Sequence, residues 1–225
     1  MSIQNIIDKA ENIVITRGKI SGSTISRGGR LRSALVAGNQ PYIFTVTFAP
    51  YQTYSNMRST IEDLEKLDLV QYEDIDIGST NTGMSWMVEY QGDLTTAQLG
   101  NLKLSGTYSG NSIDIETEDV TGSSSSDLMF RKGDYITFTD GYKYPYQVTA
   151  DVQIGAVTTG SNVTVNVHRP IIAQTGYTFN DTKGVLVGTD VTWRVKMTQK
   201  PGFTVIPGRY VQATGDFVIM EFIED

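Results

Sequence analysis

The chain has 225 residues and is rich in Gly (22), Tyr (12) and Phe (8), with one His and no Cys. The absence of cysteine excludes a thiolate metal site, a disulfide framework and a cysteine nucleophile. A chain of this length holds one large β domain or two smaller ones, each with its own core. We expect a mainly β protein with two domains.

The net charge of −7 is unevenly distributed along the chain. Residues 1–127 carry 9 basic and 16 acidic side chains, whereas residues 128–225 carry 9 of each. This balance does not indicate general nucleic-acid binding. The first residues lack the basic start and apolar core of a secretion signal, and no run of about 18 apolar residues indicates a membrane span. We therefore expect a soluble protein without a membrane partner.

The first predicted domain, residues 1–118, begins with a short amphipathic helix from Ser2 to about Glu11. A strand is expected from Ile13 onward. The following segment, 17–32, holds five basic residues and no acidic one, among glycines and serines. A solvated hairpin or a flexible loop is the simpler interpretation of this basic segment, and a contact surface for an acidic neighbour is the alternative.

Strict alternation of apolar and polar residues predicts a strand over residues 42–48. Ser55 is the expected N-cap of a helix over residues 56–68, whose apolar positions recur at helical spacing. Glu62 and Lys66 have the spacing of a favourable pair on its outer face. We expect this helix to cover one face of the sheet.

Residues 62–76 contain seven acidic side chains and one basic side chain. A solvated face explains them most simply, but they could also contact the basic segment of a neighbouring copy. Such a head-to-tail contact closes into a ring when the rotation between copies permits. We predict that Arg27, Arg30 and Arg32 of one copy face Asp63, Glu65 or Asp74 of the next.

Alternating residues predict two further strands, over 84–90 and around 113–116. The Gly/Ser-rich stretch 119–127 then has the composition of a flexible linker. The second predicted domain, residues 128–225, is expected to be a β-barrel or β-sandwich, because short strands and turn signals recur at regular spacing. Its clearest part is the segment 133–170, which contains two hairpins' worth of alternating sequence and an expected strand over 146–152. Further strands are expected over 185–187 and 191–197.

Candidates for chemistry are few, and each has a simpler structural explanation. His168, the single histidine, follows an alternating strand and is expected to be structural. Asp114 and Glu116 share the polar face of a strand, with Glu118 and Asp119 close behind, so paired-carboxylate catalysis is a minor alternative. Asp74 and Asp76 do not fit a calcium-binding loop. The chain lacks the common hydrolase, phosphate-binding and dinucleotide-binding motifs.

The segments GDYITF, YPYQVTADV, VNVHRPI, VLVGTDVTWRVKM and GDFVIMEFIE resemble the β-barrel region of tail-tip and baseplate proteins of tailed bacteriophages. The segments YSNMRSTIEDLEKLD and GMSWMVEYQGDL resemble the ring-forming domains of the same class. The resemblance covers most of the chain. It implies a distal-tail-like protein, with a hexameric ring that joins tail tube to hub and a peripheral β domain, and it implies no catalytic residue.

These observations predict a structural subunit of a virion tail or baseplate that is assembled in the host cytoplasm. Its expected partners are copies of itself and other tail or baseplate proteins. We expect no enzymatic activity, no metal and no cofactor. Two alternatives remain open: a carbohydrate-binding or receptor-recognition module that uses Tyr142 and Tyr144, and a glycan-degrading enzyme that uses a pair of carboxylates.

Overall fold

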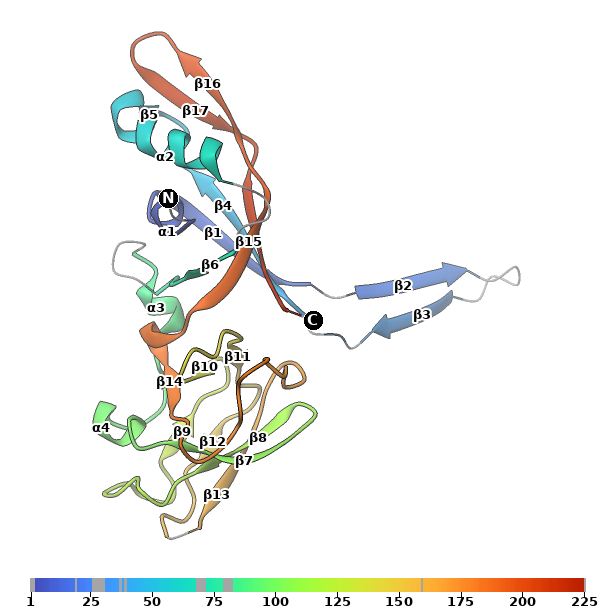
Figure 1. The fold of residues 1–225 in the computed structure, drawn as a ribbon, viewed down its shortest axis with the longest axis vertical. Helices are drawn as coiled ribbons and strands as arrows, with labels where there is room; N and C mark the ends of the chain where they lie inside the picture. The colour runs from blue at the N-terminus through green and yellow to red at the C-terminus, as the bar shows by residue number, and fades with distance from the viewer. Residues whose placement is uncertain are drawn as a thin grey trace. The chain divides into compact units, whose positions relative to one another are not determined.

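The computed structural model describes residues 3–18, 20–25, 31–36, 38, 40–67, 72–78, 83–158 and 160–224, with the backbone alone for 20–25 and 31–36. Antiparallel strands dominate these residues, which confirms the prediction of a mainly β protein (Figure 1). The chain forms two compact units. Unit 1 comprises Met1–Glu73 and Val195–Ile223, and unit 2 comprises Asp74–Arg194 and Glu224–Asp225.

This division differs from the expected one, in which a linker over residues 119–127 separates two sequential domains. Residues 119–127 lie inside unit 2, and Val120 is completely buried there. The Ser123 hydroxyl donates to the Val120 carbonyl at 3.1 Å, and the Ser124 amide donates to the Asp127 carboxylate at 2.7 Å. The serines therefore form turns around a buried valine, and the last strands of the chain return to unit 1.

The largest sheet has the strand order β1-β4-β18-β15-β6. Its strands are β1 (Ala10–Arg17), β4 (Tyr42–Phe48), β18 (Phe217–Glu221), β15 (Trp193–Gln199) and β6 (Tyr72–Ile75). The predicted strand over residues 42–48 is confirmed, and Phe44 and Val46 are completely buried. The neighbours of β4 are β1, close in sequence, and β18, at the other end of the chain.

Two helices of unit 1 pack against each other, α1 (Ile3–Ile7) and α2 (Tyr54–Lys66). The first is shorter than predicted because the chain enters β1 at Ala10. Helix α2 buries Met57 and Leu64 as its spacing predicts, but its N-cap is Thr53 rather than Ser55. An ion pair on this helix joins Arg58 to Glu62 at 3.4 Å, one turn before the predicted Glu62–Lys66 pair.

The described part of unit 1 also holds two smaller sheets. Strands β2 (Ile20–Ile25) and β3 (Leu31–Val36) form an antiparallel pair, which agrees with the hairpin interpretation of the basic segment. The second sheet has the order β16-β17-β5, with β16 (Gly202–Ile206), β17 (Tyr210–Thr214) and β5 (Gln52–Thr53). Strand β5 leads directly into α2, so this sheet places the start of the helix beside the β16–β17 turn.

The described residues of unit 2 form three small sheets, with the orders β11-β10-β14, β12-β9 and β13-β8-β7. Their strands are β7 (Lys103–Ser109), β8 (Ser112–Glu116), β9 (Leu128–Phe130), β10 (Tyr135–Phe138), β11 (Tyr146–Gln147), β12 (Val152–Gln153), β13 (Asn162–Asn166) and β14 (Val185–Val187). The single strand expected over 146–152 is thus divided into β11 and β12, which belong to different sheets.

The described residues of unit 2 also form three short helical elements, namely α3 (Ser85–Val88), α4 (Thr96–Leu99) and the 3-10 helix η1 (Gly188–Asp190). The prediction of a strand over residues 84–90 is wrong, because α3 occupies this position. Its alternating pattern did not correspond to one buried face: Val88 is buried but Trp86 is 69% exposed. Helix α4 is held by a reciprocal capping box between Thr95 and Gln98.

Candidate functional site

His168 is part of the core of unit 2, as the structural interpretation predicted. Its side chain is 7% exposed, and its Nδ1 accepts a hydrogen bond from the Gln147 amide at 3.0 Å. The His168 amide donates to the Gln147 carbonyl, also at 3.0 Å. The imidazole therefore ties two backbone segments together, and its position is that of a structural side chain rather than a general base in a cleft.

The two tyrosines considered for sugar stacking are core residues. Tyr142 and Tyr144 are 2% and 1% exposed, so neither ring can form a surface platform for a ligand. The Tyr142 hydroxyl lies 2.6 Å from the Tyr146 hydroxyl and donates to the Ile172 carbonyl at 2.6 Å. Burial raises the pKa of Tyr142 far above its ordinary value. The sequence pattern does not distinguish these two buried tyrosines from exposed tyrosines, because buried and exposed tyrosines both occur next to turns.

Arg169 is completely buried beside this tyrosine cluster, a feature that the sequence did not reveal. Its guanidinium donates to the Pro145 carbonyl at 2.8 Å and lies 5.3 Å from the centre of the Tyr146 ring. A buried arginine is uncommon because removing its charge from water is costly. Here the arginine joins the 145–146 and 169 segments and is part of the scaffold.

The candidate catalytic carboxylates form hydrogen bonds and ion pairs with neighbouring strands and turns. Asp114 accepts a hydrogen bond from the Thr164 hydroxyl at 2.6 Å, and Glu118 accepts one from the Gly160 amide at 2.8 Å. Asp119 pairs with Lys103 at 2.5 Å. Burial, followed by the nearby charges of Asp181 and Glu118, raises the pKa of Glu116. Within the described part of the chain, no group of three or more His, Asp or Glu residues could hold a metal ion.

The residues predicted for a charged contact between copies are described only in part. Arg27 and Arg30 lie outside the described residues, and Arg32 is described by its backbone, paired with Thr24 in the β2–β3 hairpin. Glu65 of α2 pairs with Lys200 at 3.3 Å within the same chain. Asp63, also on α2, has no ion pair among the described residues. The predicted contact stays a prediction, and Asp63 is its least engaged carboxylate.

Asp74 belongs to an ion-pair network within unit 2. Its carboxylate accepts from Lys143 Nζ at 2.8 Å and from Arg194 Nε at 3.0 Å. Arg194 also pairs with Glu224 at 3.1 Å, and the Glu224 amide donates to the Tyr144 hydroxyl at 3.0 Å. Burial by itself raises the pKa of Asp74, but the bonds from Arg194 and Lys143 outweigh burial and hold it below 3.8.

This network has a defined place along the chain. Asp74 and Glu224 each begin a segment of unit 2, and Arg194 ends one. The three points at which the chain enters or leaves the unit are therefore joined by charge-assisted hydrogen bonds. Asp74 is thus already paired with Lys143 and Arg194 of its own chain, and an arginine of a second copy would have to compete with them.

A cavity of about 610 Å³ lies among α3, α4 and η1 in unit 2. Exposed Trp86 lies on its wall together with Tyr90, and the carboxylates of Glu89 and Asp190 and several hydroxyls also line it. The Tyr90 hydroxyl donates to the Met129 carbonyl at 2.6 Å, and burial raises the pKa of Tyr90 to about 12. Tyr90 is therefore a neutral, fixed wall residue at physiological pH, whereas Trp86 is free to contact a ligand.

Comparison with known proteins identifies no relative of this chain. No protein-family model matches the chain, and no curated protein matches it significantly. No helix in the described residues has the length and apolar character needed to cross a membrane.

Proposed function

We propose that this chain is a structural subunit of a bacteriophage tail or baseplate, assembling into a homo-oligomeric ring. The β2–β3 hairpin is the observation that carries the proposal. Its two six-residue strands form a separate sheet, which leaves each strand with one unpaired edge among the described residues. A two-stranded hairpin is marginally stable alone in water, and free strand edges pair with other chains. A neighbouring subunit is the partner that would stabilise this hairpin.

Charge supports a copy of the same chain as that partner. The hairpin region carries the basic segment, whereas the protein has a net charge of −7, so a second copy presents an acidic surface on average. Asp63, a half-buried carboxylate of α2, is the favoured acidic contact. The proposal includes other tail or baseplate proteins as further partners and assigns no catalytic activity to the chain.

The first prediction concerns this charged contact. Replacing both Arg30 and Arg32 with Glu is expected to lower the oligomer mass in low salt, because attraction between copies becomes repulsion. Size-exclusion chromatography with light scattering, together with negative-stain images, measures the mass and shows whether rings form. The control reverses Lys9 and Lys132, two exposed cations with the same total charge change, and should leave the mass unaltered.

An oligomer that survives the Arg30 and Arg32 reversal in low salt contradicts this contact but leaves the ring itself in place. A wild-type protein that stays monomeric at high concentration contradicts the ring. The first result therefore tests the predicted arginine contact, and the second tests the ring assembly.

The Trp86 cavity favours a second candidate function, carbohydrate binding. An exposed tryptophan can stack on the apolar face of a sugar ring, and the carboxylates of Glu89 and Asp190 can accept hydrogen bonds from sugar hydroxyls. Its volume of about 610 Å³ lies within the usual range for small-molecule sites. This location replaces Tyr142 and Tyr144, which are buried.

The two tryptophans of the chain provide a direct test of this second function. Trp193 is 1% exposed and Trp86 is 69% exposed, so a ligand in the cavity should change the fluorescence of Trp86. Titration with chitotetraose and maltotetraose is expected to produce a saturable change that Trp86→Phe abolishes. Tyr108→Phe, at an exposed aromatic outside the cavity, is the matched control. An unchanged signal in the wild type rejects binding of these two sugars.

A further inference from the structure

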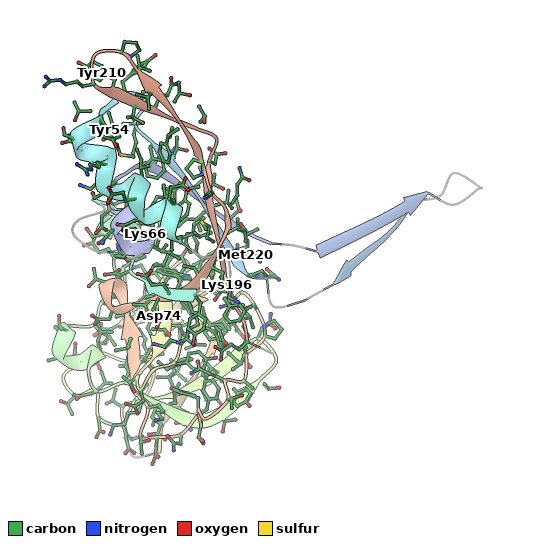
Figure 2. The ribbon with its side chains drawn as sticks, turned by 45° about the horizontal axis from the view of Figure 1, so that its top comes forward. Tyr54, Lys66, Asp74, Lys196, Tyr210 and Met220 are labelled. Atoms are coloured by element: carbon green, nitrogen blue, oxygen red, sulfur yellow. The ribbon has the colours of Figure 1, made fainter. Side chains whose placement is uncertain are left out.

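Exposed aromatic side chains gather around the start of α2 and the β16–β17 turn in unit 1. We call this set the tyrosine–arginine surface and define it as Tyr51, Tyr54, Arg58, Val205, Arg209 and Tyr210. Most of these residues line a groove of about 1010 Å³. Figure 2 labels Tyr54 on α2 and Tyr210 on β17, which lie near each other at the same end of this unit.

The apolar part of this surface is exposed to solvent. Tyr54 and Tyr210 are 46% and 45% exposed, Tyr51 is 66% exposed and Val205 is 72% exposed. Single exposed apolar residues are common, but a group of them marks an interaction site. Tyrosine and arginine are also the residue types that are enriched in the energetically dominant parts of protein interfaces. The composition therefore indicates a protein partner.

The surface is held in place by the backbone rather than carried on a loose loop. The Tyr54 amide donates to the Arg209 carbonyl at 2.8 Å, and Tyr210 pairs with Thr53 across the β17–β5 ladder. Arg209 has a φ of 75°, a left-handed conformation that is unfavourable for a residue with a side chain. Gly208 precedes it with a φ of 98°, which only glycine adopts readily. The strained turn fixes Arg209 beside the two tyrosines.

The charge of the groove selects an acidic partner. Its lining includes Arg58 and Arg209 and no carboxylate. Arg58 has an exposed pairing with Glu62, which contributes little, and Arg209 has no ion pair among the described residues. A second copy of this chain, with a net charge of −7, has the complementary charge.

Strand pairing offers a second mode of contact at the same place. Strand β16 is paired with β17 along all five of its residues and lies at the edge of its sheet, so its outer edge is unpaired among the described residues. A free strand edge next to exposed apolar side chains is a template for another strand. We propose that the tyrosine–arginine surface, with the edge of β16, contacts a second copy of this chain. The inference rests on the proposed self-assembly and names one of its contact surfaces.

The absence of cysteine allows a site-specific test. A nitroxide spin label is placed on Val205→Cys in β16, and a matched label is placed on Thr107→Cys, an exposed strand position in unit 2. Raising the protein concentration until oligomers form is expected to immobilise the label at position 205. The label at position 107 should keep its mobility, and light scattering on the same samples records the mass.

A paired substitution supplies the energetic counterpart of the labelling experiment. Tyr54→Ser combined with Tyr210→Ser is expected to weaken self-association at least tenfold, since both residues are exposed and their loss leaves the core intact. Circular dichroism checks the fold, and Tyr72→Ser, at an exposed tyrosine outside the groove, serves as the control.

The outcomes of these experiments either support the contact between copies at this surface or reject it. Oligomers in which the label at position 205 stays mobile place the contact elsewhere and overturn the inference, while the proposed assembly survives. Protein that remains monomeric at every concentration overturns both. Immobilisation of the label by an added single-stranded oligonucleotide, without any effect of protein concentration, rejects a second copy and identifies an anionic ligand instead.

Discussion

Arg169→Ala is expected to lower the free energy of unfolding of unit 2 by about 3 kcal/mol. The substitution removes a completely buried side chain, and the Pro145 carbonyl loses the donor that lies 2.8 Å away. An unsatisfied buried polar group costs about 1–3 kcal/mol, and the cavity left by the side chain adds to that cost. The contact with the Tyr146 ring is lost as well.

Fluorescence during chemical denaturation measures the effect of Arg169→Ala. In a Trp86→Phe background, Trp193 is the sole tryptophan, and its burial in unit 2 makes its emission sensitive to unfolding. Arg131→Ala is the control, because its guanidinium is about half exposed and pairs with Asp93 on the surface. The control should cost less than about 1 kcal/mol. Equal effects of the two substitutions would show that Arg169 has no special structural role.

Asp74→Asn is expected to destabilise unit 2 by about 1 kcal/mol at neutral pH. The substitution leaves Lys143 and Arg194 without their shared carboxylate, although the side chains of both are mostly buried. Breaking a fully buried pair costs about 3–5 kcal/mol, and the partial exposure of Asp74 reduces this figure through solvent screening. The same tryptophan fluorescence measures the change, and Asp181→Asn, at an exposed carboxylate that has no ion pair in the described part of unit 2, is the control.

The effect of Asp74 should also depend on pH in a defined direction. Its pKa is lower in the folded protein than the ordinary value of 3.8, so ionisation favours folding. The stabilisation is fully present above about pH 3.8 and is lost as the pH falls through the lower folded pKa. The wild type and Asp74→Asn should therefore converge in stability as the pH falls below 3.8. A difference that persists unchanged at low pH would contradict the ionic origin of the effect.

Single strands could be predicted from the sequence, because burial of one face of a strand produces an alternation of apolar and polar residues with a period of two. The strand over residues 42–48 and that at Val185–Val187 agree with the structure at both ends. The alternation from Val191 to Met197 also corresponds to a buried face. Trp86 shows the limit of this reasoning. Its short alternating segment fits a strand by pattern, but one turn of helix places its side chain on a cavity wall.

Sites built from distant segments were not predictable in the same way. The sequence marked Tyr142 and Tyr144 as candidate ligand contacts and did not single out Arg169, and all three are buried together in unit 2. The tyrosine–arginine surface likewise combines the start of α2 with a turn about 150 residues later, so no local motif announces it.

The amino-acid sequence was sufficient to predict that the protein is mainly β, that it has no disulfide or thiolate chemistry, and that residues 1–127 carry the acidic excess. These properties follow from composition and local periodicity. The three-dimensional arrangement was needed to show that β18 pairs with β4 and that residues 119–127 lie inside unit 2. A period-two pattern specifies which face of a strand is buried but not which strand lies beside it. The sequence left a hairpin or a flexible loop open for the basic segment, and the structure shows two paired strands that form a sheet of their own.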